Sequence, residues 1–413
     1  MKNKRVFVLF FVVLVVISLL ISLIGYTAST SDDLMKNIKP NELNLDININ
    51  DGNRGAIDFS IWLFQNSLAD KENTLMSPLS VLCALAMVAN GADDNTLSQM
   101  ESVFGISIVE LNEYLHVYLK SLPSDDKVSL DIANSIWLKK DSISVAKDFL
   151  QTNADYYDAS IYTALFDDGT LRDINNWVSG KTNGMIKHIL DEIPSDAFMY
   201  LINAIAFDAE WEKIYAECSV RSGAFTSISG QKCDAQMMYS TEGVFLNDSD
   251  ATGFIKYYAG RKYAFVAMLP NEGILVNDYI STLTGQKIVS ILNNKQQLTV
   301  GTAVPKFKSV YSIELNDILS DMGMSDAFDP YAANFSRLAS SPVEIYISKV
   351  IHKAIISVDE KGTKAGASTA IELSYSSAPL EPPKTVYLDR PFVYMLIDCE
   401  TNIPVFIGTV LDL

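Results

Sequence analysis

The sequence contains few of the residues and motifs that enzymes and metal sites use. It has 413 residues but only three histidines, His116, His188 and His352. The patterns G-x-S-x-G, H-E-x-x-H and C-x-x-C are absent, and so is a phosphate-binding P-loop. We therefore expect no catalytic site, no bound metal and no cofactor, and we predict that the protein is not an enzyme.

Basic residues and cysteines are also scarce. The chain has 32 Lys and Arg against 50 Asp and Glu, which gives a formal net charge of −18. This imbalance argues against a nucleic-acid-binding face, and it is explained equally well by attraction to cationic partners or by solubility alone. Four cysteines do not make a disulfide framework in a chain of this length. Cys83 lies in an apolar helical run and is predicted to be buried, whereas Cys218 and Cys233 could pair, which the sequence leaves open.

The N-terminus has the pattern of a targeting segment. Lys2, Lys4 and Arg5 precede an apolar run from Val6 to Ile24. We predict that residues 1–28 are a secretion signal or a retained membrane anchor, and the run is long enough for either. In both cases the rest of the protein is expected outside the cell, secreted or tethered to the outer face of the membrane. Residues 29–54 are polar and predict a flexible spacer.

Residues 55–413 predict one large α+β domain, because no internal repeat divides them and helical and strand patterns are mixed. The stretch "SPLSVLCALAMVANGA" (77–92) is apolar on all sides and predicts a buried helix. The apolar stretch "FMYLINAIAFDAEW" (198–211) predicts a strand covered on both faces. Two strands separated by Gly260 and Arg261 predict a hairpin.

One segment near the C-terminus changes character along its length. From Thr363, side chains alternate between a small-to-apolar face and a small-to-polar face, as in a strand. Pro379, Pro382 and Pro383 then exclude a central strand. On composition alone, a flexible surface loop is the simpler interpretation of this segment.

Six motifs elsewhere in the chain change that interpretation, because together they resemble the serpin family. They are "NTLMSPLSVLCALAMVANGADDNTLSQM" (73–100), "INNWVSGKTNGMI" (174–186), "LINAIAFDAEW" (201–211), "VPKF" (304–307), "VIHKAIISVDEKGT" (350–363) and "LDRPFVYML" (388–396). Each motif is modest by itself, but all six occur in the order and at the spacing of the family. The resemblance covers nearly all of residues 55–413.

The resemblance implies a fold and a mechanism. The fold is an α+β domain with three β-sheets and about nine helices, and it exposes a reactive-centre loop at about residues 360–385. A target serine protease cleaves this loop and forms an acyl-enzyme. The loop then inserts into the central sheet and traps the protease in a covalent 1:1 complex. The resemblance therefore implies an irreversible suicide-substrate inhibitor, which we expect to be a monomer.

By the same resemblance, the loop begins with a hinge in which Thr363 is the first residue to enter the sheet. A small residue there is typical of inhibitory members, and this favours an inhibitor. The alternative is a non-inhibitory serpin that acts as a binding protein or chaperone. The hinge residues are Glu360, Gly362, Thr363, Ala365, Gly366, Ala367, Ser368 and Thr369.

The usual loop length of the family places the cleaved bond between Ser376 and Ser377, and Tyr375 or Leu380 are alternatives for the residue before the cut. A serine before the bond suits an elastase-like or subtilisin-like protease, and Tyr375 would suit a chymotrypsin-like one. Trypsin-like enzymes do not fit, because no Lys or Arg lies between Lys364 and Lys384.

The resemblance also identifies two sets of switch residues in the body of the protein. The shutter controls opening of the central sheet and gives His352 a hydrogen-bonding role, although His352 alone would be interpreted as a core histidine. The breach is where the loop first enters, and Lys306 and Glu360 are expected to form an ion pair there. The shutter residues are Ser77, Pro78, Ser80, Asn203 and His352, and the breach residues are Trp211, Lys306 and Glu360.

Overall fold

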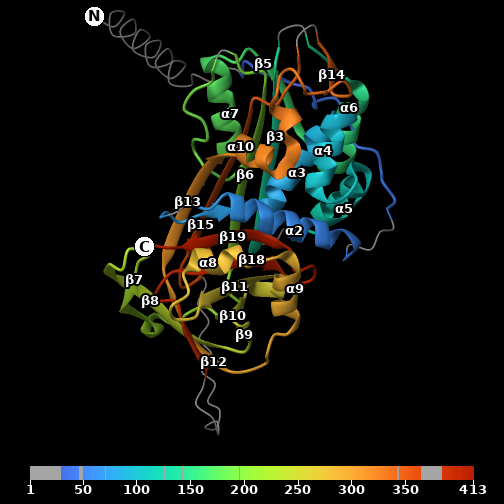
Figure 1. Cartoon of the computed structure of the whole chain (residues 1–413). Helices are drawn as coiled ribbons and strands as arrows, with labels where there is room; N and C mark the ends of the chain where they lie inside the picture. Colours follow the sequence, from blue (N-terminus) through green and yellow to red (C-terminus); the bar gives the residue numbers. More distant parts are fainter. Residues whose placement is uncertain are drawn as a thin grey trace, which may run out of the picture.

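Helices and strands are mixed along the chain, as the sequence predicts. Figure 1 shows the computed structural model, which describes residues 29–45, 50–69, 71–123, 127–140, 143–194, 196–341, 344–363 and 384–413. Within these ranges no helix is long and apolar enough to cross a membrane, and the predicted signal or anchor at residues 1–28 lies outside them. The nine α-helices of the described residues are α2 (Asn50–Asn66), α3 (Pro78–Ala89), α4 (Asp94–Phe104), α5 (Ile108–Lys120), α6 (Lys147–Tyr157), α7 (Asp168–Lys181), α8 (Val276–Ser281), α9 (Gly285–Asn293) and α10 (Asn316–Leu319).

The large sheet has seven strands in the order β1–β5–β3–β6–β16–β15–β13. Its strands are β1 (Asp32–Asp33), β3 (Val128–Lys139), β5 (Ser160–Ala164), β6 (Met199–Glu210), β13 (Phe307–Glu314), β15 (Lys349–Val358) and β16 (Gly362–Thr363). Strands β6 and β15 run parallel and pair directly from Tyr200 and Lys349 to Ala206 and Ile355, a ladder that we call the central junction. At one end of this junction, β16 lies between the two strands and is antiparallel to both.

Strand β6 has an unbroken apolar sequence because both faces of the large sheet are covered. Tyr200 and Ile202 join a buried cluster beneath α7. Leu201 and Ile205 point to the opposite face and join the main core, which includes α3. The prediction of a strand covered on both faces is confirmed, and alternate residues of one strand thereby serve two separate hydrophobic layers.

Two further sheets complete the fold, and a short pair of strands, β4 (Ser144–Val145) and β14 (Ala339–Ser340), adds to the three sheets that were predicted. The predicted hairpin is present, since β10 and β11 pair antiparallel around η2 (Ala259–Arg261). The six-stranded sheet contains β2 (Leu75–Met76), β19 (Pro404–Val410), β18 (Phe392–Asp398), β11 (Tyr263–Pro270), β10 (Ala251–Tyr257) and β9 (Phe245–Asn247), in that order. The four-stranded sheet contains β17 (Lys384–Tyr387), β12 (Val300–Pro305), β8 (Lys232–Glu242) and β7 (Val220–Thr226).

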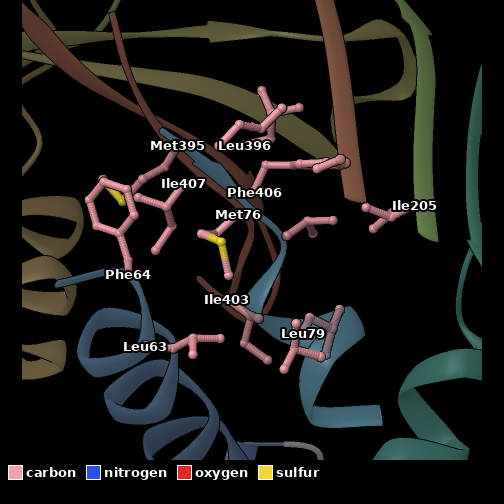
Figure 2. Close-up of a cluster of buried hydrophobic side chains, with 14 of the residues drawn as sticks. Leu63, Phe64, Met76, Leu79, Ile205, Met395, Leu396, Ile403, Phe406 and Ile407 are labelled. Carbon is pink, nitrogen blue, oxygen red and sulfur yellow. The ribbon is translucent and has the colours of Figure 1, made fainter. Parts of the chain in front are cut away.

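The main core fills the space where α2 and α3 meet the large and the six-stranded sheets. Figure 2 shows part of it, with side chains from both helices pointing toward β18 and β19. Burial of each such side chain contributes about 1.5–3 kcal/mol. The labelled residues are Leu63, Phe64, Met76, Leu79, Ile205, Met395, Leu396, Ile403, Phe406 and Ile407, and none is more than 2% exposed.

The segment before the first helix departs from the prediction of a flexible spacer for residues 29–54. Within residues 29–45, β1 pairs antiparallel with β5 at the edge of the large sheet. Leu34, Met35 and Ile38 pack against the core, although the segment as a whole is polar. Asp173 of α7 accepts five hydrogen bonds at one carboxylate oxygen, all from residues 29–31. The spacer interpretation was therefore wrong for this part, because three apolar anchors and one acceptor fix it.

The four cysteines are all free thiols. Cys218 and Cys233 therefore do not form the disulfide that the sequence left open. Cys83 is buried in α3 as predicted, and burial raises the pKa of its thiol to about 12.

We predict that Asp173→Ala frees residues 29–34 from the edge of the sheet. The substitution removes five hydrogen bonds to a charged acceptor. The Leu34 amide, which donates to the carbonyl oxygen of Ile161, should then exchange its hydrogen about tenfold faster. Asp168→Ala removes the same charge from the exposed first turn of α7 and serves as the control. Equal exchange at Leu34 in the two variants would contradict the anchoring role of Asp173.

Candidate functional site

The hinge begins where β15 ends, and a tight turn returns the chain to the large sheet. The Asp359 carboxylate accepts the backbone N–H of Lys361 at 2.8 Å and that of Gly362 at 3.2 Å. The Asp359 N–H in turn donates to the carbonyl oxygen of Gly362 at 2.9 Å. This local pairing is typical of an aspartate in a turn. It directs Gly362 and Thr363 into the gap between β6 and β15, where they form β16.

Strand β16 fits this gap because its two residues are small. A β carbon at position 362 would lie 2.0 Å from the carbonyl oxygen of Ala209, so only glycine is accommodated there. Thr363 is fully buried, and its hydroxyl lies 2.6 Å from the hydroxyl of Tyr258. The resemblance identified Thr363 as the first residue to enter the sheet, and the structure places it already inside, at the end of the central junction.

The structure brings the three breach residues together around the hinge. Lys306 and Glu360 form the expected ion pair, with 2.5 Å between the ammonium nitrogen and a carboxylate oxygen. The hydrogen bond from Lys306 lowers the pKa of the Glu360 carboxyl. Trp211 donates its indole N–H to the carbonyl oxygen of Asp359 and its backbone N–H to that of Lys361, each at 2.9 Å. Trp211 therefore holds the hinge backbone by hydrogen bonds, and Lys306 holds the Glu360 side chain by charge.

Two tyrosines that the sequence interpretation missed also contact the hinge. The Tyr215 backbone N–H donates to the carbonyl oxygen of Glu360 at 2.9 Å. Tyr258 bonds Thr363 and stacks on Trp211, with ring centroids 4.4 Å apart. Both lie in segments that the six motifs do not include. The predicted hairpin contains Tyr258 but gave no indication of a contact with the hinge.

The shutter residues also meet, midway along the central junction. Asn203 of β6 and His352 of β15 are directly opposite each other in the parallel ladder, and the His352 Nδ1 is hydrogen-bonded to the Asn203 side-chain oxygen. The Asn203 amide group donates to Ser80 at the start of α3 and to Asn134 of β3. Asn134 is a further residue that the sequence interpretation missed. The side-chain hydrogen bond between Asn203 and His352 thus adds to the backbone ladder that joins the two strands of the junction.

The protonation state of His352 follows from its partners. The Ser77 backbone N–H donates to His352 Nε2 at 3.1 Å, so this nitrogen carries no proton. The ring is therefore neutral and donates from Nδ1 to Asn203. Burial lowers the pKa of His352 from 6.5 to about 3, because a charged ring has no solvent around it. Pro78 begins α3 and fixes the chain direction after Ser77.

The remaining predicted site residues cannot be placed in this way. Ala365, Gly366, Ala367, Ser368 and Thr369 of the hinge lie outside the described residues. The same holds for the predicted cleavage residues Tyr375, Ser376, Ser377 and Leu380. Thr363 of β16 is the last described residue before this segment, and the chain is next described at Lys384, where β17 begins in the four-stranded sheet.

Comparison with known protein families identifies the family to which this chain belongs. A sequence model of the family described as Serpin (serine protease inhibitor) matches residues 54–413. The chain belongs to the serpin family. Family membership supports serine protease inhibition in general, and the described residues of this serpin hold no group of three or more His, Cys, Asp or Glu side chains that could bind a metal ion.

Three relatives illustrate the similarity. A serpin-like protein of Thermococcus kodakarensis is 29% identical over 366 residues, which cover 86% of this serpin and 84% of the relative. Corticosteroid-binding globulin of Saimiri sciureus is 27% identical over 369 residues, covering 86% and 89% of the two chains. The crystal structure of Tengpin, a thermophilic serpin, in its native state is 49% identical with a TM-score of 0.90, and the match covers 93% of this serpin and 100% of Tengpin.

Tengpin also indicates which state this serpin adopts. Its latent state matches with a TM-score of 0.79 at the same 49% identity, covering 90% and 100% of the two chains. The arrangement of this serpin is therefore more similar to the native state than to the latent one.

The buried neutral His352 predicts a loss of stability on acidification. The unfolded chain binds a proton near pH 6.5, whereas the folded protein does not until about pH 3. Stability should therefore fall as the pH drops below 6.5, by about 2 kcal/mol between pH 7 and pH 5. In His352→Gln, which can still donate to Asn203 and accept from Ser77, the stability difference between the two pH values should shrink by this amount. Chemical denaturation of both proteins at each pH measures it, and an unchanged difference would contradict the assignment to His352.

Proposed function

We propose that this serpin is an irreversible suicide-substrate inhibitor of serine proteases that acts outside the cell. A target protease cleaves the loop after Ser376 and forms an acyl-enzyme. The loop then continues β16 into the central junction and traps the protease in a covalent 1:1 complex. The apolar N-terminal run supports a protein that is secreted or tethered to the outer face of the membrane.

The observation that carries this proposal is the position of β16. Gly362 and Thr363 lie between two parallel strands and pair antiparallel with each. The loop that follows them alternates like a strand to about residue 376 and contains no proline before Pro379. Continued insertion replaces one parallel ladder with two antiparallel ladders, which are slightly more stable per residue.

Energetics require that the intact protein be metastable. Each new ladder hydrogen bond contributes about 0.5–1.5 kcal/mol net, while ordering each residue costs about 1–2 kcal/mol. These contributions nearly cancel, and burial of Ile371 and Leu373 adds only about 1.5–3 kcal/mol each. The work of distorting a protease must therefore come from strain in the large sheet that insertion relieves.

A second candidate is a non-inhibitory binding protein. The similarity to corticosteroid-binding globulin favours it, since that relative is named for a ligand that it binds. Against it, Thr363 is small and buried, and Gly362 fits the gap beside Ala209 without a side chain. A hinge that already begins to insert favours the inhibitor.

The proposal predicts a complex that survives denaturing electrophoresis. Mixing the protein with pancreatic elastase or subtilisin should give a covalent species and release a peptide of residues 377–413, which mass spectrometry identifies. Chymotrypsin is expected to cut after Tyr375 instead. Trypsin serves as the control, because no Lys or Arg lies between Lys364 and Lys384. Cleavage by elastase, subtilisin and chymotrypsin without any covalent species would favour the binding protein.

Thr363→Arg should turn the inhibitor into a substrate. The larger side chain cannot be buried beside Tyr258 without leaving an unpaired charge, so the hinge should be expelled from the sheet. We expect the number of inhibitor molecules consumed per inactivated protease to rise at least about tenfold, with cleavage retained. Thr363→Val keeps the shape and should behave like wild type. An arginine variant with wild-type stoichiometry would refute insertion at this position.

A further inference from the structure

A buried lysine lies directly behind the breach. The Lys256 side chain, at the end of β10, is only 3% exposed. Its ammonium nitrogen lies 2.8 Å from a carboxylate oxygen of Glu242, which ends β8 and is 12% exposed. The Ser240 hydroxyl donates to the same carboxylate oxygen at 2.6 Å. A buried ammonium requires such a partner, because leaving it unpaired is costly.

The same ammonium also contacts two aromatic rings. It lies 4.3 Å from the ring centroid of Tyr215 and 5.4 Å from that of Trp211. At these distances a cation is attracted to the face of a ring, and the attraction is strongest where water is excluded. Both aromatic residues follow β6 of the large sheet, Glu242 belongs to the four-stranded sheet, and Lys256 to the six-stranded sheet. One charge therefore joins the four-stranded and six-stranded sheets to the segment that follows β6 of the large sheet.

These two aromatic residues are the ones that hold the hinge backbone. The Trp211 and Tyr215 backbone N–H groups donate to the carbonyl oxygens of Lys361 and Glu360, and the Trp211 indole donates to that of Asp359. The Lys256 ammonium therefore contacts the rings of the same two residues whose N–H groups donate these three hydrogen bonds. The Lys306–Glu360 pair acts instead on a side chain of the hinge, that of Glu360.

A purely stabilising role does not account well for this arrangement. Buried ion pairs contribute little net stability compared with well-packed apolar residues. What a fixed charge adds is a defined position for the rings that face it.

We propose that Lys256 is a positioning residue for the hinge. Its ammonium, held by Glu242, fixes Trp211 and Tyr215 so that they hold residues 359–361 in register for insertion. The kinetic consequence rests on the proposed inhibitory function. Without the ammonium, the point where the loop enters the sheet loosens, insertion begins later, and more protease escapes by completing hydrolysis.

Hydrogen exchange tests the positioning without any protease. In Lys256→Met, the Trp211 and Tyr215 amides should exchange about tenfold faster than in wild type. Lys287→Met is the matched control, because Lys287 lies 3.1 Å from Asp248 and 4.9 Å from the Tyr279 ring but on α9, away from the hinge. It should leave both amides unchanged. Wild-type exchange at Trp211 and Tyr215 in Lys256→Met would overturn the proposal.

A double variant separates positioning from stability. Lys256→Met combined with Glu242→Gln leaves no unpaired charge, so its thermal midpoint should recover toward wild type while the two amides still exchange fast. Recovery of slow exchange in the double variant would show that the ammonium is not needed and would overturn the proposal. This variant also serves if Lys256→Met alone does not fold.

The inhibitory consequence is measured with the protease that forms the covalent complex. Lys256→Met and the double variant should both consume about three times more inhibitor per inactivated protease, corresponding to a loosened but intact hinge. Lys287→Met should match wild type. If wild-type protein forms no complex with any protease, the proposed function fails, whereas the exchange result still decides the role of Lys256. Fast exchange with unchanged stoichiometry would overturn the kinetic part of the proposal.

Discussion

The closed ladder between two parallel strands is the constraint on which the rest of the structure depends. Strands β6 and β15 pair directly along the central junction. At one end of the junction, β16 already lies between them. The breach holds the open end, and the hydrogen bond between Asn203 and His352 holds the middle. The proposed inhibition depends on how this ladder stays closed and where it begins to open.

The contacts that keep this ladder closed at the breach and at the shutter differ in their chemistry. At the open end, the Lys306–Glu360 pair is about one third exposed, so solvent weakens its attraction. At the centre, His352 is buried and neutral, and no solvent is available to replace its hydrogen bonds when the strands part. Losing these bonds there is therefore costly. This difference, together with the position of β16, is consistent with the proposed insertion beginning at the breach and proceeding toward the shutter.

The sequence predicted much of the fold, and the reasons are local. The apolar run of β6, the buried helix α3 and the hairpin at Gly260 follow from periodicity and turn residues within short windows. The spacer prediction failed because Asp173, which fixes residues 29–31, lies more than 140 positions away in the chain. Asn134, Tyr215, Tyr258 and Lys256 were missed for the same reason. Their partners lie far away in the sequence, on other strands or in other sheets. The pattern of "GFIKYYA" does not distinguish Lys256 from an exposed strand lysine, because its buried partner Glu242 belongs to the four-stranded sheet.

The pairing of the N-terminal segment with one particular half of the large sheet determines what would move in the proposed insertion of the loop. An added strand widens a sheet by about 4.8 Å, so β1, β5, β3 and β6 must shift as a block away from β15 and β13. The contacts of residues 29–31 with α7 lie within this block and travel with it unbroken. The bond from the Lys353 ammonium to the carbonyl oxygen of His188 joins β15 to the chain after α7 and spans the two halves, so it is severed as the halves separate.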